Sequence, residues 1–311
     1  MKFAFILDPL ESLKIVKDTS LAIMREAAAR GHTLFVAEQD DLILRNGTAL
    51  LQAAEFQFSE GQEWFSLDAK TLHTPTDFDA VLMRKDPPFD TEYIYSTYLL
   101  ELAENQGARV LNRPRSIRDW NEKLSVARFP QFAPPFLVTR HIAAIRQFLE
   151  DEGDIVVKPL DGMGGSGVFR LHRQDHNIGV ILETITHYER RTVMAQRYLP
   201  EIKAGDKRIL IIDGEPLPYA LARIPKAGET RGNLAAGGKG VAQPLSARDR
   251  EIATAVGIEL KKEGLFLVGL DVIGDHLTEI NVTSPTGMVE IAAQTDCNPA
   301  ALFVDALERL G

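Results

Sequence analysis

The sequence predicts an α/β domain with a parallel sheet, followed by a second domain of the α+β class. Three observations indicate this: the chain has 311 residues, about twice a usual single domain; it opens with a strand–helix–strand pattern; and its second half alternates β-branched runs with turn residues. Apolar residues make up 45% and charged residues 25%, which is typical of a globular protein. We therefore expect a packed core in both halves.

The first domain is predicted from a βαβ unit. Residues 2–7 and 33–38 are short apolar runs that favour buried strands. Between them, residues 18–20 are candidate N-caps for a helix that stops at Gly31. Such a unit implies parallel strands joined by a right-handed crossover. Further elements are expected in the same domain, at 78–83 (strand), 91–106 (helix) and 108–112 (strand).

Residues 117–129 look like one more helix, and a proline-rich connector follows it. We therefore place a domain boundary near residue 120, which divides the chain into 1–120 and 121–311. Beyond the boundary the pattern changes to β-hairpins, in which β-branched runs are separated by Gly, Pro and Asp. The expected strands lie within residues 154–160, 167–172, 193–199, 207–217, 265–275 and 277–283.

The charge balance limits the possible partners. The chain has 35 Lys and Arg against 44 Asp and Glu, a net charge of −9, so it is not a generally basic binder of nucleic acid or of anionic membranes. A single cysteine, Cys297, excludes an internal disulfide framework and a cysteine-based zinc site. The apolar run at the start is too short for a signal sequence, so a cytoplasmic location is expected.

A lysine and a glycine-rich loop form the first candidate site. Lys158 lies inside an apolar strand pattern, and the loop after it carries glycines at 162, 164, 165 and 167. Such a loop brings several backbone N–H groups close to one anion. It joins two strands and does not lead into a helix, so it is not a Walker A loop. The alternative is a flexible hairpin with a lysine at a strand edge.

A second candidate site is the glycine-rich segment 223–240, which contains Arg231 and two lysines. This composition fits a lid that closes over phosphates and excludes water. Lys207, Arg208 and Arg223 add cations on neighbouring strands. The alternative is an ordinary exposed loop.

The third candidate site lies on the last predicted hairpin. Strand alternation places Glu279 and Asn281 on one face, and a three-residue loop at 274–276 would set Asp271 opposite Glu279. Two carboxylates and an amide oxygen suit Mg²⁺, which leaves its other positions to water and phosphates. The alternative is an exposed polar face, although two adjacent like charges are costly without a cation.

The order of these signals resembles the ATP-grasp fold, and the strings around them resemble the prokaryotic glutathione synthetase family over nearly the whole chain. RKDPPFD (84–90) and TRGNLAAGG (230–238) are the most family-specific strings. The others are NEKL (121–124), VVKPLDGMGGSGVF (156–169), MAQRYLP (194–200), GDKRIL (205–210) and GLDVIGDHLTEINVTSPTG (269–287).

The resemblance implies a ligase that joins γ-glutamylcysteine to glycine through an acyl phosphate, with ATP converted to ADP and phosphate. It implies Mg²⁺, with Mn²⁺ as an alternative, and a homotetramer. It also implies an ATP-grasp domain of two subdomains, 121–197 and 198–311, that clamp the nucleotide. No enzyme nucleophile is needed, which agrees with the absence of a Ser/His/Asp or Cys/His signature.

Residue roles follow from the same resemblance. The nucleotide phosphates would be held by Lys123, Lys158 and the loop residues Asp161, Gly162, Met163, Gly164, Gly165, Ser166 and Gly167. The adenine and ribose would meet Gln196, Arg197, Tyr198, Leu199 and Asp206. The metal ligands would be Asp271, Glu279 and Asn281. The transferring phosphoryl group and the lid would involve Arg208, Arg223, Arg231 and Asn233. Substrate carboxylates would be held by Arg84, Ser284, Pro285 and Thr286.

Two other functions stay open at this point. One is a different carboxylate–amine ligase of the same fold, such as a D-alanine–D-alanine ligase, which we do not expect to carry the two family-specific strings. The other is an inactive ATP-binding regulator. Retention of Lys123, Lys158, Asp271, Glu279 and Asn281 argues against that loss of activity.

Overall fold

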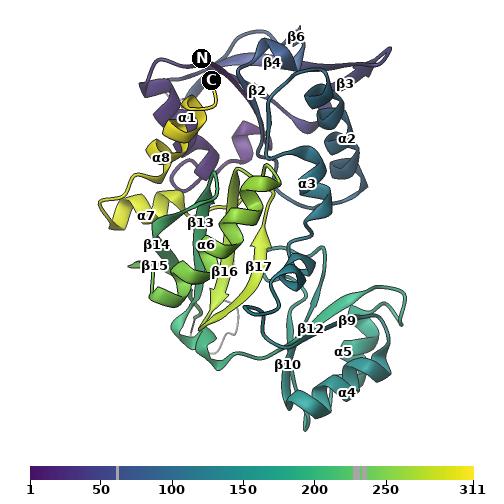
Figure 1. Ribbon diagram of the computed structural model, residues 1–311. Coiled ribbons are helices and arrows are strands. Elements are labelled where there is room, and N and C mark those ends of the chain that lie inside the picture. Colours follow the sequence, from purple (N-terminus) through teal and green to yellow (C-terminus); the bar gives the residue numbers. More distant parts are fainter. Residues whose placement is uncertain (61–62, 227–231, 233–236) are drawn as a thin grey trace.

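The structure is a computed structural model that describes residues 1–60, 63–226, 232 and 237–311, and it contains three β-sheets (Figure 1). The first sheet contains the strands β1 (Lys2–Ile6), β2 (Thr33–Ala37), β3 (Leu42–Arg45), β4 (Thr48–Phe58), β5 (Phe65–Leu67), β6 (Thr71–His73), β7 (Ala80–Met83) and β8 (Val110–Leu111). Its order is β3-β4-β2-β1-β7-β8, with β5 and β6 paired to β4.

The predicted parallel sheet is present, because β2, β1, β7 and β8 are parallel neighbours. The prediction missed the antiparallel strands β3 to β6, which widen this sheet. A signal for them exists in the sequence. Asn46 and Gly47 separate the apolar residues of β3 from those of β4, and both have positive φ, as a two-residue hairpin turn requires.

Capping residues explain where the first helices begin. Asp18 accepts a hydrogen bond from Leu21 N (2.8 Å) at the start of α1 (Thr19–Ala29). Asp90 does the same for Tyr93 N (3.0 Å) at the start of α2 (Thr91–Asn105). Each carboxylate satisfies a backbone donor that the helix leaves without a partner.

One continuous helix was predicted over 117–129, and this was wrong, because the structure has two separate helical segments there. α3 (Pro114–Asp119) ends before Trp120, and a short 3₁₀ helix, η4 (Leu124–Arg128), follows. Between them Asn121 Oδ1 accepts from the backbone N–H groups of Lys123 (3.1 Å) and Leu124 (3.0 Å). Asparagine competes in this way with helical hydrogen bonds. This break between α3 and η4 determines the position of Lys123.

The second and third sheets make up the rest of the chain. The second sheet has the order β11-β10-β12-β9, and the third has the order β15-β14-β13-β16-β17. The second consists of β9 (Phe136–Thr139), β10 (Asp154–Pro159), β11 (Phe169–His172) and β12 (Val193–Arg197), with the helices α4 (Ile142–Glu152) and α5 (Ile178–Ile185). The third consists of β13 (Asp206–Ile212), β14 (Glu215–Ile224), β15 (Lys239–Pro244), β16 (Leu267–Ile273) and β17 (His276–Asn281), with α6 (Ala247–Lys262).

All strands of these two sheets pair antiparallel, as predicted for the second half. The predicted domain boundary at residue 120 and the predicted subdomain boundary at residue 197 fall between sheets. Both boundaries stay a prediction. The remaining 3₁₀ helices are η1 (Leu10–Ser12), η2 (Gln39–Asp41), η3 (Pro75–Asp77) and η5 (Pro200–Ala204). Among the described residues, no helix is long and apolar enough to cross a bilayer.

The C-terminal helices return to the first domain. α7 (Met288–Gln294) and α8 (Pro299–Glu308) both contact α1, and the two termini lie close together in Figure 1. Arg30, at the end of α1, pairs with Asp305 (2.6 Å) and Glu308 (3.0 Å). Helix α8 therefore packs on the N-terminal domain, although the predicted division assigned it to the second one.

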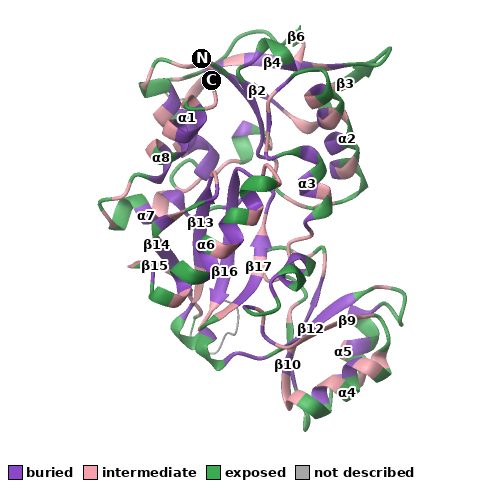
Figure 2. Ribbon diagram, in the orientation of Figure 1, coloured by how far each residue is buried: buried purple, intermediate pink, exposed green. Residues whose placement is uncertain are grey.

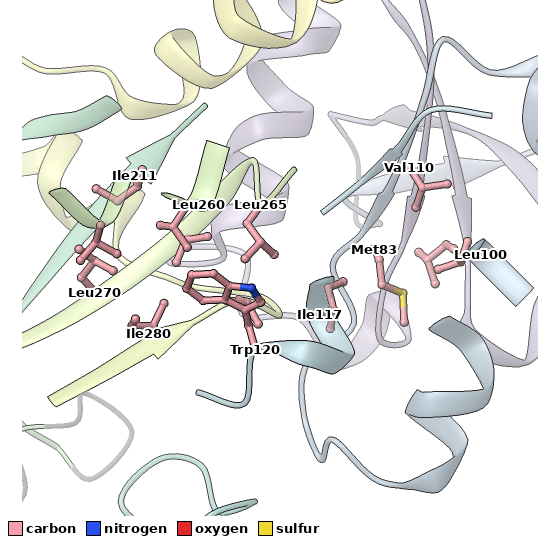
Figure 3. Packing of buried hydrophobic residues seen from close by; sticks show 14 of the residues in the cluster. Met83, Leu100, Val110, Ile117, Trp120, Ile211, Leu260, Leu265, Leu270 and Ile280 are labelled. Carbon is pink, nitrogen blue, oxygen red and sulfur yellow. The ribbon is translucent and has the colours of Figure 1, made fainter. Parts of the chain in front are cut away.

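Buried side chains join the first and third sheets into one core. Trp120 is only 2% exposed and lies between Ile117 and the residues Leu260, Leu265 and Ile280 (Figure 3). Figure 2 shows that the strands β13 and β16 are buried over most of their length. The second sheet has a small core of its own with α4 and α5, and it projects away from the other two sheets in Figure 1.

Candidate active site

A cavity of about 540 Å³ lies where the three sheets meet. Its lining comes from the loop after β10, the end of β12, the strands β13, β14, β16 and β17, and segments of the N-terminal domain. Segments far apart in the sequence are brought together here by the tertiary structure. Large concave sites with converging polar groups are the usual places for ligand binding and catalysis.

Two lysines and one carboxylate form the first part of the site. Lys158, on β10, is 5% exposed, and its Nζ lies 3.1 Å from Glu279 Oε1. Lys123 Nζ donates to the Gly162 carbonyl (2.6 Å) and lies 4.0 Å from the same Glu279 atom. Burial by itself would raise the pKa of Glu279, but the two lysines outweigh it and hold this pKa below its ordinary value. Glu279 is therefore ionised at neutral pH.

Two arginines surround the second carboxylate. Arg208 Nε and Nη2 donate to the two oxygens of Asp271 (2.6 and 3.1 Å), and Arg223 Nη2 lies 2.8 Å from Asp271 Oδ2. Burial would raise the pKa of Asp271, yet the two guanidinium groups hold it well below its usual range. Gly269 makes room for this arrangement, because a Cβ there would lie 2.8 Å from Arg208 Cδ. The result is a buried cluster in which each of the two carboxylates has two cations beside it.

Asp271 lies directly opposite Glu279, as predicted, but for a different reason. The hairpin loop has two residues, Gly274 and Asp275, and a register shift between Asp271 and Val272 supplies the extra residue. Such a β-bulge re-aims side chains near active sites. Asn281 is on the same strand, and its Nδ2 donates to the Gly269 carbonyl (3.1 Å).

Asp206 is the third carboxylate of this cluster. Neighbouring cations stabilise its ionised form less than they stabilise the ionised forms of Asp271 and Glu279. Burial raises the pKa of Asp206 to about 6, and its ion pair with Arg223 offsets only part of that effect. Its Oδ1 is buried and has no hydrogen-bond partner among the described residues. An acceptor left without a partner in this way indicates a position where a ligand donor would be favourable.

We expect Asp206→Asn to change how stability depends on pH. Between pH 4 and pH 6 the folded wild type binds more protons than the unfolded chain, so its stability falls as the pH rises, by up to about 3 kcal/mol from this group. The neutral asparagine removes this loss, and the variant should gain on the wild type between pH 4 and pH 7. Urea unfolding of both proteins at the two pH values, without nucleotide or metal, measures the difference. A difference that does not change with pH would contradict the assignment.

The end of β12 forms the part of the cavity predicted to meet the adenine. Gln196, Tyr198 and Leu199 are buried, and all three line the cavity together with Arg197. The Arg170 guanidinium stacks on the Tyr198 ring, 3.6 Å from its centroid. Gln196 Nε2 is buried without a hydrogen-bond partner among the described residues, so a donor is available at this position.

The structure brings most of the predicted site residues to one cavity. The predicted residues that line it are Lys123, Lys158, Gly162, Met163, Gly164, Gly165, Ser166, Gln196, Arg197, Tyr198, Leu199, Asp206, Arg208, Arg223, Asp271, Glu279, Asn281, Ser284, Pro285 and Thr286. Their individual roles stay predictions.

Three predicted residues are not part of this lining, and two lie outside the described residues. Asp161 pairs with Arg191, and Gly167 lies near the end of the glycine loop. Arg84 is 6% exposed and donates to Ser20 Oγ (3.0 Å) and to the Pro285 carbonyl (3.1 Å). Burial lowers the pKa of Arg84. Arg231 and Asn233, the two residues predicted for the lid, lie outside the described residues.

The sequence analysis missed several charged residues of the cavity. Glu122 comes from the segment after α3, Glu290 from α7, and Lys14 and Lys17 from the loop before α1. The pKa of Glu122 is raised by burial, which outweighs the attraction of Lys123. Glu122 precedes Lys123 in the NEKL string and was the only one of these residues with a local signal.

The fold and the cavity together define an ATP-grasp protein, with a cavity between two antiparallel sheets. Solved structures support the fold. The structure is similar to a D-cycloserine synthetase, DcsG, with a TM-score of 0.71 at 17% identity over all of both chains. It is also similar to a D-alanyl-alanine synthetase A from Vibrio cholerae, with a TM-score of 0.61 at 13% identity over 99% of this chain and 98% of that one. At such low identity these similarities describe the fold alone.

The sequence comparisons identify the family. The prokaryotic glutathione synthetase N-terminal domain matches residues 1–118, and the ATP-grasp domain of the same enzymes matches residues 122–296. Glutathione synthetase of Nitrosomonas europaea is 62% identical over 99% of this chain and 98% of its own length. That of Neisseria meningitidis serogroup A is 55% identical over the same shares. The chain belongs to the prokaryotic glutathione synthetase family.

Proposed function

We propose that this protein is an ATP-dependent ligase that joins the cysteinyl carboxylate of γ-glutamylcysteine to the amine of glycine. The observation that carries the proposal is full-length membership of the family together with a cavity lined by Lys123, Lys158, Arg208, Arg223 and the facing carboxylates. A D-alanine-type ligase is supported only by fold similarity at 13% identity, which says nothing about the substrate.

The residues of the cavity suit the charges of this reaction. A substrate carboxylate attacks the γ-phosphoryl group of ATP, ADP leaves, and an acyl phosphate forms. The glycine amine then attacks the acyl carbon, phosphate leaves, and the nitrogen gives up a proton. The first step brings two anions together, so it needs fixed cations that are already in place. Lys123, Lys158, Arg208 and Arg223 meet this need, because each is held in place by a carboxylate or a carbonyl.

The donor set on β16 and β17 fits a divalent metal ion. Asp271, Glu279 and Asn281 offer two carboxylates and one amide oxygen, which are hard ligands of the kind that Mg²⁺ or Mn²⁺ prefers. Among the described residues no cluster of three or more His, Cys, Asp or Glu is found that could hold a metal alone. Substrate phosphates and water would complete the coordination, and the bound ion would neutralise phosphate charge.

The remaining assignments belong to the same proposal. Gln196 to Leu199 and Asp206 would hold the adenosine, and the loop 161–167 would cover the phosphates. Arg231 and Asn233 would act on the lid, and Ser284 to Thr286 would face the substrate. We also propose a homotetramer in the cytoplasm, which is what the family resemblance implies.

Phosphate release tests the proposed function. We expect release from ATP and Mg²⁺ with γ-glutamylcysteine and glycine, and none above background with D-alanine as both substrates. Turnover with D-alanine alone would show a ligase of the other class. Binding of ATP with no turnover of either substrate set would show an inactive regulator. Mass spectrometry of the peptide product serves as the control for uncoupled ATP hydrolysis.

A further inference from the structure

Part of the cavity lining comes from the N-terminal domain and from α7, and these residues are not among those proposed to hold ATP. This part, which we call the N-terminal lobe, is lined by Asp8, Lys14, Lys17, Asp86 and Glu290. Helix α1 contacts α7, and the loop before α1 and Glu290 of α7 line the same cavity. A cavity for the ligation must hold a dipeptide as well as a nucleotide. The N-terminal lobe is therefore available for the dipeptide.

Two carboxylates of the lobe already have partners in the protein. Asp8 pairs with Lys85 (2.6 Å) and accepts a hydrogen bond from the Asp86 backbone N–H (2.8 Å). The Asp86 side chain accepts a hydrogen bond from the Ser284 hydroxyl. These contacts fix the wall of the lobe, and they leave Asp8 and Asp86 little need for a ligand.

Three charged side chains of the lobe are different. Lys14 is exposed and Lys17 is half-buried, and neither forms an ion pair with another described residue. Glu290 Oε2 is buried and has no hydrogen-bond partner among the described residues. Opposite charges thus line one cavity without pairing with each other. A buried acceptor without a partner is unfavourable unless a ligand supplies the donor.

We propose that the lysine pair, Lys14 and Lys17, binds the α-carboxylate of the γ-glutamyl residue, and that Glu290 binds its α-ammonium group. This inference rests on the proposed function. A γ-linked glutamyl residue carries both free charges on one carbon, at the end of the dipeptide away from the reacting carboxylate. Separate unpaired charges of both signs in one lobe complement such a zwitterion. The lobe therefore selects dipeptides that are linked through the side-chain carboxyl group.

Two substrate analogues test each half of this recognition. 4-Aminobutyryl-cysteine lacks only the α-carboxylate, and glutaryl-cysteine lacks only the α-ammonium group. With glycine, ATP and Mg²⁺, the wild type should use each analogue with a kcat/KM that is about 10- to 100-fold lower than for γ-glutamylcysteine, because each leaves a charged group of the protein without its partner.

Variants then assign each preference to its residues. The double variant Lys14→Met/Lys17→Met should lose the preference over 4-aminobutyryl-cysteine and keep the preference over glutaryl-cysteine. Glu290→Gln should show the reverse pattern. Lys262→Met, at an exposed lysine of α6, is the matched control and should keep both preferences. Comparing substrates within each variant removes any general loss of activity or folding.

The outcomes separate this inference from the proposed function. If the wild type does not ligate γ-glutamylcysteine, the proposed function fails. If the wild type ligates γ-glutamylcysteine but the double variant and Glu290→Gln keep both preferences unchanged, the N-terminal lobe does not bind the α-carboxylate and α-ammonium groups. The inference is then overturned. Loss of each preference only in its predicted variant supports it.

Discussion

Lys158→Met is expected to lower kcat/KM for the ligation by about 100- to 1,000-fold, the size seen when one preorganised charge is removed from a transition state. Lys158 is almost fully buried in the cavity, and no other lysine of β10 can replace it. The substitution also removes the nearer of the two cations beside Glu279, whose Oε1 lies 3.1 Å from Lys158 and 4.0 Å from Lys123. Methionine keeps the length of the aliphatic stem, so packing changes little.

Steady-state phosphate release measures this effect, and circular dichroism with thermal unfolding checks the fold. Lys262→Met is again the matched control, since this side chain is exposed on α6 and, among the described residues, pairs only with Glu259. A Lys158→Met variant that is folded and retains more than a tenth of the wild-type kcat/KM would contradict the role given to this lysine.

Asn112→Ala is expected to lower the free energy of unfolding by about 3 kcal/mol. Asn112 is 5% exposed and follows β8, and its Nδ2 donates to the carbonyls of Leu267 (2.8 Å) and Val282 (2.7 Å). Its Oδ1 accepts from Leu267 N (2.8 Å). One side chain thus joins the first sheet to β16 and to the residue that follows β17 in the third. Alanine leaves all three backbone groups buried without these partners.

Urea unfolding followed by fluorescence and by circular dichroism measures this loss. Asn105→Ala, at the exposed end of α2, should change stability by less than about 0.5 kcal/mol and is the matched control. Asn112→Asp tests the mechanism further, because it keeps the acceptor for Leu267 N and removes both donors. Equal stability of Asn112→Ala and the wild type would show that the junction does not depend on these hydrogen bonds.

The sequence by itself determined the family, the positions of most strands along the chain and the residue types that line much of the cavity. The site residues are visible locally because charged side chains are costly to bury without a partner. Lys158 lies inside an apolar run, and Asp271 and Glu279 lie on a hairpin that is mostly apolar. The family-specific strings did the rest. The parts it missed had weaker local signals, as with the antiparallel hairpin at Asn46 and Gly47 and the break of the helix at Trp120.

Only the tertiary structure decided which charges meet. Asp271 is joined to Arg208 by register across β13 and β16, and Lys123 reaches Gly162 because the chain turns after α3. Lys17 and Glu290 are 273 positions apart, and only the packing of α7 on α1 places them in one lobe. Local sequence patterns specify strands and turns through short-range geometry. Electrostatic partners are selected by contacts between distant segments, which depend on how the sheets pack.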